Sequence, residues 1–297
     1  MKTKNNFTLV ELIAAMGVFS LIMLMVMTMF LSVQTIWKKS SQESQVFENA
    51  RIALDLMARD LQCAYYEVNK TPFWFKPDTS GIAAYKVAAD IQYKNPALCF
   101  ISDTLVPPNP YCESKMCEIK YQLYGTTYDI INANDGWLLR SATGDKKADG
   151  SDNLYNAAAT PTGTLKFYNF YKVRVRGGTP AAQVFTLDTG SSDVWEQVIP
   201  YVTSMTFECN RRDGSAVAGY APASTTTSYT PTKTLSPFPF SVRFTLTLLD
   251  SDSWNKWRAM AKAGTATAEP AAAVTFRQQR ERKFSKTVLL GERGQAK

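Results

Sequence analysis

The sequence predicts an α+β protein in which a long N-terminal helix packs on an antiparallel β-sheet. Residues 12–31 contain no charged residue and no proline, and 20 residues is the length that an α-helix needs to cross the hydrocarbon of a bilayer. Apolar residues then recur at helical spacing as far as Ala64, and beyond Pro72 the pattern changes to the alternation that is typical of strands. The helix is therefore expected to be transmembrane in its first half and amphipathic in its second.

The chain is expected to have four parts. Residues 1–6 are a short basic leader, 7–33 the transmembrane helix half, 34–70 the amphipathic helix half, and 71–297 a β-rich head. One continuous helix is predicted as far as Val68, because the first proline after it is Pro72. Its apolar stripe has spacings of three and four residues. The stripe consists of Phe47, Ala50, Leu54, Met57, Leu61 and Ala64.

A single acid, Glu11, lies just inside the start of the apolar run. An ionised side chain costs roughly 2.5–3.5 kcal/mol at the centre of a membrane helix and less near an end, so such a residue usually has a partner. A secretory signal peptide would have a shorter apolar region followed by a small-residue cleavage site, which residues 32–44 do not contain. An ordinary membrane anchor fits the length but leaves Glu11 unexplained.

The segment FTLVEL, residues 7–12, resembles the processing motif of type IV pilins and type II secretion pseudopilins. In that family a membrane peptidase cleaves just before the Phe and methylates the new amino terminus, which implies cleavage between Asn6 and Phe7 and N-methylation of Phe7. The fifth mature residue, a Glu, matches Glu11. The resemblance implies that this carboxylate neutralises the amino terminus of a neighbour when helices stack in a fibre, since a buried pair costs far less than a lone charge. The family normally has Gly where this sequence has Asn6.

The resemblance also implies a pilin-like fold and a function in assembly, with no enzymatic activity. The chain would be a minor pilin or pseudopilin with a single span in the bacterial inner membrane and its head outside the cytoplasm. Its partners would be other pilin or pseudopilin subunits, bound through the N-terminal helix, the prepilin peptidase and membrane lipid. A plain anchored surface domain is a third option, which would keep Met1 or lack the methylation.

Composition excludes several other classes of function. The chain has no histidine, which removes Ser–His and Cys–His catalysis and most transition-metal sites; no cofactor is expected. The net charge of +7 is spread out except in the tail 277–286. This tail could touch nucleic acid or acidic lipid, but a solvated and partly disordered end is favoured, and no interleaved aromatic residues support binding to nucleic acid.

The chain has five cysteines, an odd number, so at least one thiol is left over from any disulfide pairing. They are Cys63, Cys99, Cys112, Cys117 and Cys209. Disulfides are permitted in an exported domain. Cys112 and Cys117 flank only four residues, which makes them the candidate disulfide; a zinc site is the weaker alternative.

Beyond Pro72, runs of alternating residues predict antiparallel strands, because no helical pattern long enough for a parallel crossover lies between them. Strands are expected at 119–124, which would be half-buried, and at 137–140, its hairpin partner, and also at 165–175, 240–248 and 284–290. Three loops rich in small and polar residues are expected at 141–163, 211–239 and 261–273.

Several of these segments also resemble, in order along the chain, the minor pseudopilin J of type II secretion. They are the helical segment 49–64, the strand 118–123, the strand that ends at Arg140, and the segments 195–208 and 238–250. The long loops are additional to that pattern, so a divergent relative of the J-type subunits is equally indicated.

One string, FTLDTGSSDVW at residues 185–195, resembles the active-site loop of pepsin-like aspartic proteases. That chemistry needs two facing aspartates that share a proton. The chain has no second Asp-Thr-Gly or Asp-Ser-Gly, so Asp188 would act only in a symmetric dimer. A membrane-tethered aspartic protease is therefore the alternative function. The favoured interpretation is a strand followed by a turn at 188–192.

An acidic loop contains the candidate metal ligands. Asp145, Asp149 and Asp152 lie close together in the sequence, and oxygen ligands suit calcium. The spacing does not match an EF-hand loop. A solvated loop balanced by Lys146 and Lys147 is the favoured interpretation, and calcium remains the weak candidate.

Overall fold

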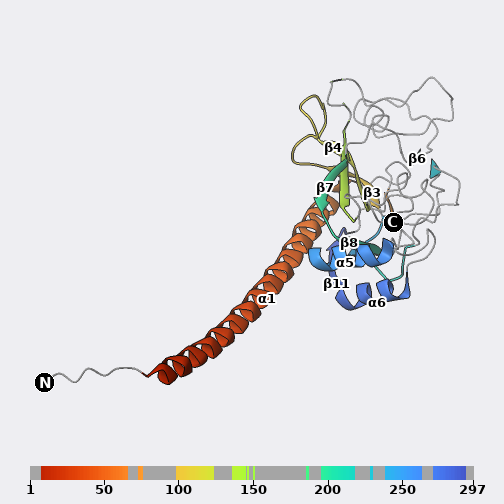
Figure 1. Cartoon of the computed structure of the whole chain (residues 1–297). Helices are drawn as coiled ribbons and strands as arrows, with labels where there is room; N and C mark the ends of the chain where they lie inside the picture. Colours follow the sequence, from red (N-terminus) through yellow and green to blue (C-terminus); the bar gives the residue numbers. More distant parts are fainter. Residues whose placement is uncertain are drawn as a thin grey trace, which may run out of the picture. The chain divides into compact units, whose positions relative to one another are not determined.

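The computed structural model describes residues 8–65, 73–75, 98–123, 136–144, 146, 150, 185–186, 195–217, 228–229, 238–262 and 270–291. Within these residues the fold is α+β, with helices and antiparallel sheets (Figure 1). The chain forms two compact units, Met1–Phe47 and Glu48–Lys297. The first unit contains most of the long N-terminal helix. The second contains the end of that helix and every described strand, and is called the head below.

Helix α1 runs from Leu9 to Gln62. The expected continuation to Val68 is wrong: Cys63 is a turn residue, and Ala64–Tyr65 form strand β1, which pairs antiparallel with Ser102 and Ile101 of strand β3. The reason is a competition for backbone hydrogen bonds. Pairing with β3 satisfies the groups that one more helical turn would have satisfied, and sequence periodicity does not register a strand partner so far along the chain.

The larger sheet has the strand order β1-β3-β4-β5-β7, and β2 also pairs with β3. The strands after β1 are β2 Phe73–Phe75, β3 Leu98–Asp103, β4 Met116–Leu123, β5 Leu138–Thr143 and β7 Trp195–Ile199. The β4–β5 pairing confirms the predicted hairpin. Because β5 continues to Thr143, the loop expected from Ser141 begins later. Strand β4 is also more buried than expected, since Lys120 and Gln122 are buried as well as the apolar residues that alternate with them.

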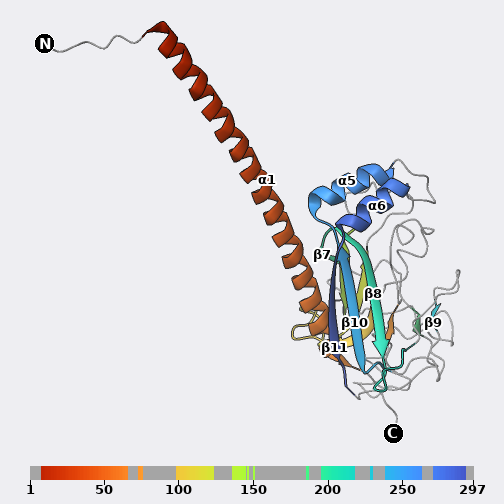
Figure 2. The ribbon, with the colours of Figure 1, turned by 90° about the horizontal axis from the view of Figure 1, so that it is seen from below.

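A second sheet has the order β11-β10-β8 (Figure 2). Its strands are β8 Val202–Asn210, β10 Ser241–Leu248 and β11 Arg282–Leu289. This confirms the strands predicted at 240–248 and 284–290. The chain passes from β7 into β8 through Pro200 and Tyr201, and Tyr201 has a left-handed φ of 66°. A separate pair joins β6 Phe185–Thr186 to β9 Ser228–Tyr229, so the loop expected at 211–239 is interrupted by a short strand.

The last part of α1 buries a stripe of small and medium side chains. Ala50, Met57, Leu61 and Ala64 are at most 1% exposed, as predicted. Phe47, expected on the same stripe, is 60% exposed, whereas Ala53, which was not expected there, is fully buried. Small residues at spacings of three and four let a helix approach a sheet closely.

Two further helices follow β10, α5 Ser251–Lys262 and α6 Ala271–Arg280, and α6 covers the end of the expected loop 261–273 and the start of the expected disordered tail 277–286. Asp250 caps α5, since its Oδ1 accepts a hydrogen bond from the N–H of Ser253 at 2.8 Å. The buried residues of this hairpin form one cluster: Leu249, Trp254, Trp257, Ala261 and Ala273. The loop expected at 261–273 is therefore wrong at its described ends, 261–262 and 271–273, while residues 263–269 lie outside the described residues. The disordered tail expected at 277–286 is wrong, because α6 and β11 cover all of it except Glu281. The Ala- and Thr-rich linker has no apolar periodicity, and two tryptophans supply most of the packing.

Candidate functional site

The first candidate site is the start of α1, where Glu11 has partners within its own chain. The N–H and the hydroxyl of Thr8 donate to Glu11 Oε2 at 2.9 and 3.0 Å, and the N–H of Glu11 donates to Thr8 Oγ1 at 3.3 Å. This is a capping box, in which Thr and Glu three residues apart satisfy each other's free backbone donors. The pattern Thr-x-x-Glu is readable in the sequence. An ordinary anchor would therefore also account for Glu11.

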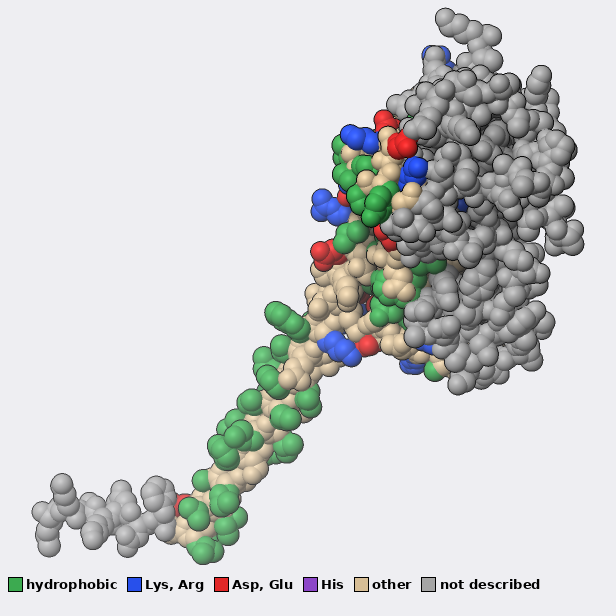
Figure 3. Space-filling model, turned by 90° about the horizontal axis from the view of Figure 1, so that it is seen from above, with side chains coloured by type: hydrophobic (Ala, Val, Ile, Leu, Met, Phe, Trp, Pro, Cys, Tyr) green, Lys and Arg blue, Asp and Glu red, His purple; other side chains and the backbone are tan. Residues whose placement is uncertain are grey.

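The stretch after Glu11 is apolar and uncovered. Every side chain at residues 12–31 is exposed, with Leu21 at 69% and Met25 at 76%. Figure 3 shows these apolar side chains along the surface of the helix. Among the described residues, α1 is the one helix that is long and apolar enough to cross a membrane, by length and composition. Such a surface needs lipid or other helices around it.

The few hydroxyls in this part of α1 are bonded within the helix. Ser20 donates to Met16 O at 2.8 Å and Thr28 to Met25 O at 2.9 Å. Ser32 donates to the carbonyl of Thr28 at 2.9 Å. A hydroxyl in hydrocarbon needs an internal acceptor, because no water is there to bond it. These three hydroxyls therefore have the acceptors that they need in lipid, and no neighbouring molecule has to supply one.

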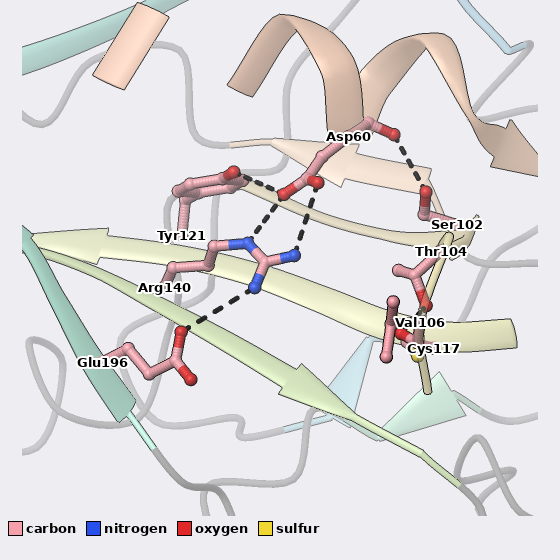
Figure 4. A network of polar contacts seen from close by, with 8 residues as sticks. All are labelled: Asp60, Ser102, Thr104, Val106, Cys117, Tyr121, Arg140 and Glu196. Carbon is pink, nitrogen blue, oxygen red and sulfur yellow. Dashed lines mark hydrogen bonds and ion pairs between the residues drawn. The ribbon is translucent and has the colours of Figure 1, made fainter. Parts of the chain in front are cut away.

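A second site lies in the head, where Asp60 of α1 is buried against the larger sheet (Figure 4). Tyr121 OH of β4 donates to Asp60 Oδ2 at 2.6 Å, and Arg140 Nε of β5 donates to the same oxygen at 2.7 Å. Arg140 Nη2 lies 3.3 Å from Asp60 Oδ1. The backbone carbonyl of Asp60 accepts a hydrogen bond from Ser102 Oγ of β3 at 2.9 Å. One residue thus joins the helix to three neighbouring strands.

Burial and charge set the electrostatics of this site. Burial raises the pKa of Tyr121 well above its ordinary value, and the negative charge of Asp60 raises it further. Burial disfavours the charged form of Arg140, but its hydrogen bonds and attraction to Asp60 outweigh this, so the pKa of Arg140 is raised. Arg140 is therefore always charged, and Tyr121 is a neutral donor at physiological pH. The 71%-exposed side chain of Glu196 lies 3.9 Å from Arg140 Nη1.

The Asp60 site is suited to holding the helix and not to catalysis. Both carboxylate oxygens are bound by neighbouring donors, and Asp60 is 6% exposed. A general base must be able to reach the proton that it abstracts. None of these residues was expected as a site from the sequence. The feature of the sequence that could have indicated this site is Asp60 itself, an acid between Met57 and Ala64 of the buried stripe.

The structure does not support the candidate disulfide, because no disulfide joins Cys112 to Cys117. Cys112 Sγ lies 3.5 Å from the carbonyl of Lys146, while Cys117 Sγ lies 3.3 Å from Thr104 Oγ1. The two thiols therefore point to different partners. Cys209 is buried, which raises the pKa of its thiol and makes it unreactive.

Several residues singled out in the sequence lie outside the described residues. They are the processing-site residues Asn6 and Phe7, the loop aspartates Asp145, Asp149 and Asp152, and the protease-like Asp188. Within the part of the chain that the structure describes, no group of three or more His, Cys, Asp or Glu could hold a metal ion. The calcium and protease interpretations therefore remain untested predictions.

Comparison of the chain with models of protein families, with curated proteins and with solved structures found no match.

Proposed function

We propose that the chain is a pilin-like subunit, a minor pilin or pseudopilin, that acts by assembly into a short fibre based in the inner membrane. The single observation that carries this proposal is the stretch of α1 at 12–31, which is exposed on every side and directly follows Glu11. The FTLVEL motif at residues 7–12, at the start of the same helix, supports the proposal through its resemblance to the processing motif of type IV pilins and pseudopilins. Membership among the J-type pseudopilins or a divergent relative is part of the proposal.

In this function, α1 would hold the subunit in the membrane with its head outside the cytoplasm until the subunit is extracted. Other helices would then replace lipid around residues 12–31, so that little apolar surface becomes exposed to water. Cleavage before Phe7 would create a new amino terminus. Glu11 would pair with the terminus of a neighbour and set the register between the two helices, because an unpaired carboxylate in an apolar environment is costly.

The Asp60 site supports the proposal in a second way. A subunit drawn out of a membrane by its helix must carry its head with it. The hydrogen bonds from Tyr121 and Arg140 to Asp60 cross from α1 to β4 and β5, so a force on the helix would reach the sheet through them.

The test separates the charge of Glu11 from its capping role. Glu11→Gln removes the charge but keeps a side chain that can complete a capping box. Thr8→Ala weakens the cap and keeps the charge. Each variant is expressed in cells that make the full apparatus, and its incorporation is measured by cross-linking to neighbouring subunits. We expect Glu11→Gln to abolish incorporation and Thr8→Ala to preserve most of it.

Normal incorporation of Glu11→Gln would refute the pairing role. Mass spectrometry of the mature protein tests the processing step independently. A methylated amino terminus at Phe7 is expected, whereas a chain that retains its leader and stays a solitary membrane protein would contradict the proposal.

A further inference from the structure

The segment that contains α5, α6 and most of β11 carries a large share of the net positive charge of the molecule. Residues 250–286 contain eight Lys or Arg and four Asp or Glu, a net charge of +4 out of +7 for the whole chain. Because α6 and β11 are folded, the charged residues of these two elements have fixed backbone positions.

The acids of this region are partly used within the fold. Asp250 caps α5, and Glu281 is bound to Arg277 at 2.6 Å, with both side chains nearly buried. Asp252 is exposed. Among the residues of this region whose exposure the structure describes, four basic residues are exposed, and this set is called the basic end: Lys256, Arg280, Arg282 and Lys283.

The basic end is gathered at one end of the smaller sheet. Arg282 and Lys283 begin β11, where they pair in register with Leu248 and Thr247 at the end of β10. Helix α5 starts shortly after Leu248, and α6 ends just before Arg282. Figure 2 shows α5 and α6 lying side by side at this end of the sheet. Lys256 lies 5.3 Å from the centre of the Phe276 ring, which ties the two helices together.

We propose that the basic end binds the anionic headgroups of the bilayer in which α1 is inserted. This inference rests on the membrane anchoring in the proposed function, because α1 runs without a break from residues 12–31 into the head. A tethered head meets the lipid surface at a high effective concentration. Lys and Arg near an anionic leaflet are each favourable, and guanidinium groups match phosphate oxygens in geometry.

The test uses the full chain, reconstituted through α1 into neutral phosphatidylcholine vesicles or into vesicles that also contain phosphatidylglycerol. Hydrogen exchange of α6 and of the start of β11 is followed by mass spectrometry. We expect slower exchange with phosphatidylglycerol, reversed by high salt. In the triple variant Lys256→Gln, Arg280→Gln, Lys283→Gln, the slowing of exchange by phosphatidylglycerol should fall by about fivefold for each charge removed. The matched control variant is Arg59→Gln, Lys115→Gln, Arg211→Gln, which removes three exposed charges elsewhere in the head and should keep the protection.

Failure of the membrane anchoring and failure of lipid binding by the basic end give different results. If the chain does not float with neutral vesicles in a density gradient, α1 does not anchor it in the membrane. The lipid proposal rests on that anchoring and is then overturned as well. If the chain floats but α6 exchanges equally in both lipids, only the lipid proposal is overturned. Protection that is unchanged in the triple variant, equally lost in the control variant, or produced only by added nucleic acid or acidic protein would also overturn it.

Discussion

Glu11 and Asp60 are two acids on the same helix, and they are satisfied in opposite ways. Glu11 is exposed and is held by Thr8, three residues away. Asp60 is buried and is held by Tyr121 and Arg140, which are 61 and 80 residues away in the chain. The first arrangement depends only on the helix, whereas the second exists only when the head has folded.

This difference indicates which part of α1 remains available for contacts with other molecules. At Asp60 the donors fill the carboxylate, and the surrounding side chains are packed. At Glu11 the capping partners are local and the apolar side chains that follow are uncovered. A helix that is complete in itself at one end and committed to a domain at the other suits a subunit that joins its neighbours through the free end.

The largest expected effect comes from breaking the buried pair. Arg140→Leu should lower the free energy of unfolding of the head by about 3–5 kcal/mol, because Asp60 would be left buried without its counter-charge. Urea unfolding of the full chain in detergent measures this loss. The matched control is Glu196→Gln, which removes the exposed partner of the same arginine and should change stability by less than about 0.5 kcal/mol. Equal effects of the two changes would show that burial at Asp60 is not decisive.

The second expected effect compares two glycines of the head, one packed and one open, with a third glycine in the uncovered helix. Gly136 has φ 79°, and a Cβ there would lie 2.2 Å from the Trp254 ring, so Gly136→Ala combines left-handed strain with overpacking. We expect a loss of about 2–4 kcal/mol by urea unfolding. Gly214 has φ 81° and no atom within 4 Å of a Cβ, so Gly214→Ala should cost only the strain, about 1–2 kcal/mol.

In α1, Gly17→Ala meets no atom within 4 Å and should leave the stability of the head unchanged, with helicity by circular dichroism equal or slightly higher. A loss in the head from Gly17→Ala would contradict the view that the two regions are independent.

The smallest expected effect is the alkaline dependence of the Asp60 site. The raised pKa of Tyr121 means that the folded state keeps the phenol proton, while an unfolded chain loses it from about pH 10. The stability linked to this residue is therefore fully present below about pH 10. It falls by up to about 1.4 kcal/mol per pH unit as the pH rises toward the folded value. In urea unfolding between neutral and alkaline pH, Tyr121→Phe should be less stable at neutral pH and show a shallower alkaline decline. An identical decline in both proteins would place the titrating group elsewhere.

A structural feature of this chain could be predicted from the sequence when the residues that cause it lie close together in the chain. The strands at 240–248 and 284–290 and the apolar run were predictable from their own residues, the strands from alternation and the run from 20 residues without a charge. The cap at Thr8 and Glu11 is equally local and readable. Asp60 could be recognised only as an acid in an apolar stripe, since its partners come from strands far along the chain. Helices α5 and α6 were missed because Trp254 and Trp257, and not a repeating pattern, create their core.

The self-contained hydroxyls of Ser20, Thr28 and Ser32 have a consequence for movement of the N-terminal helix. Exchanging acyl chains for protein around this segment breaks no hydrogen bond, because each donor already bonds a carbonyl of its own helix. The segment can therefore turn about its axis without losing any of these hydrogen bonds. In the proposed function, the carboxylate of Glu11 would supply the intermolecular polar contact that these hydroxyls do not make.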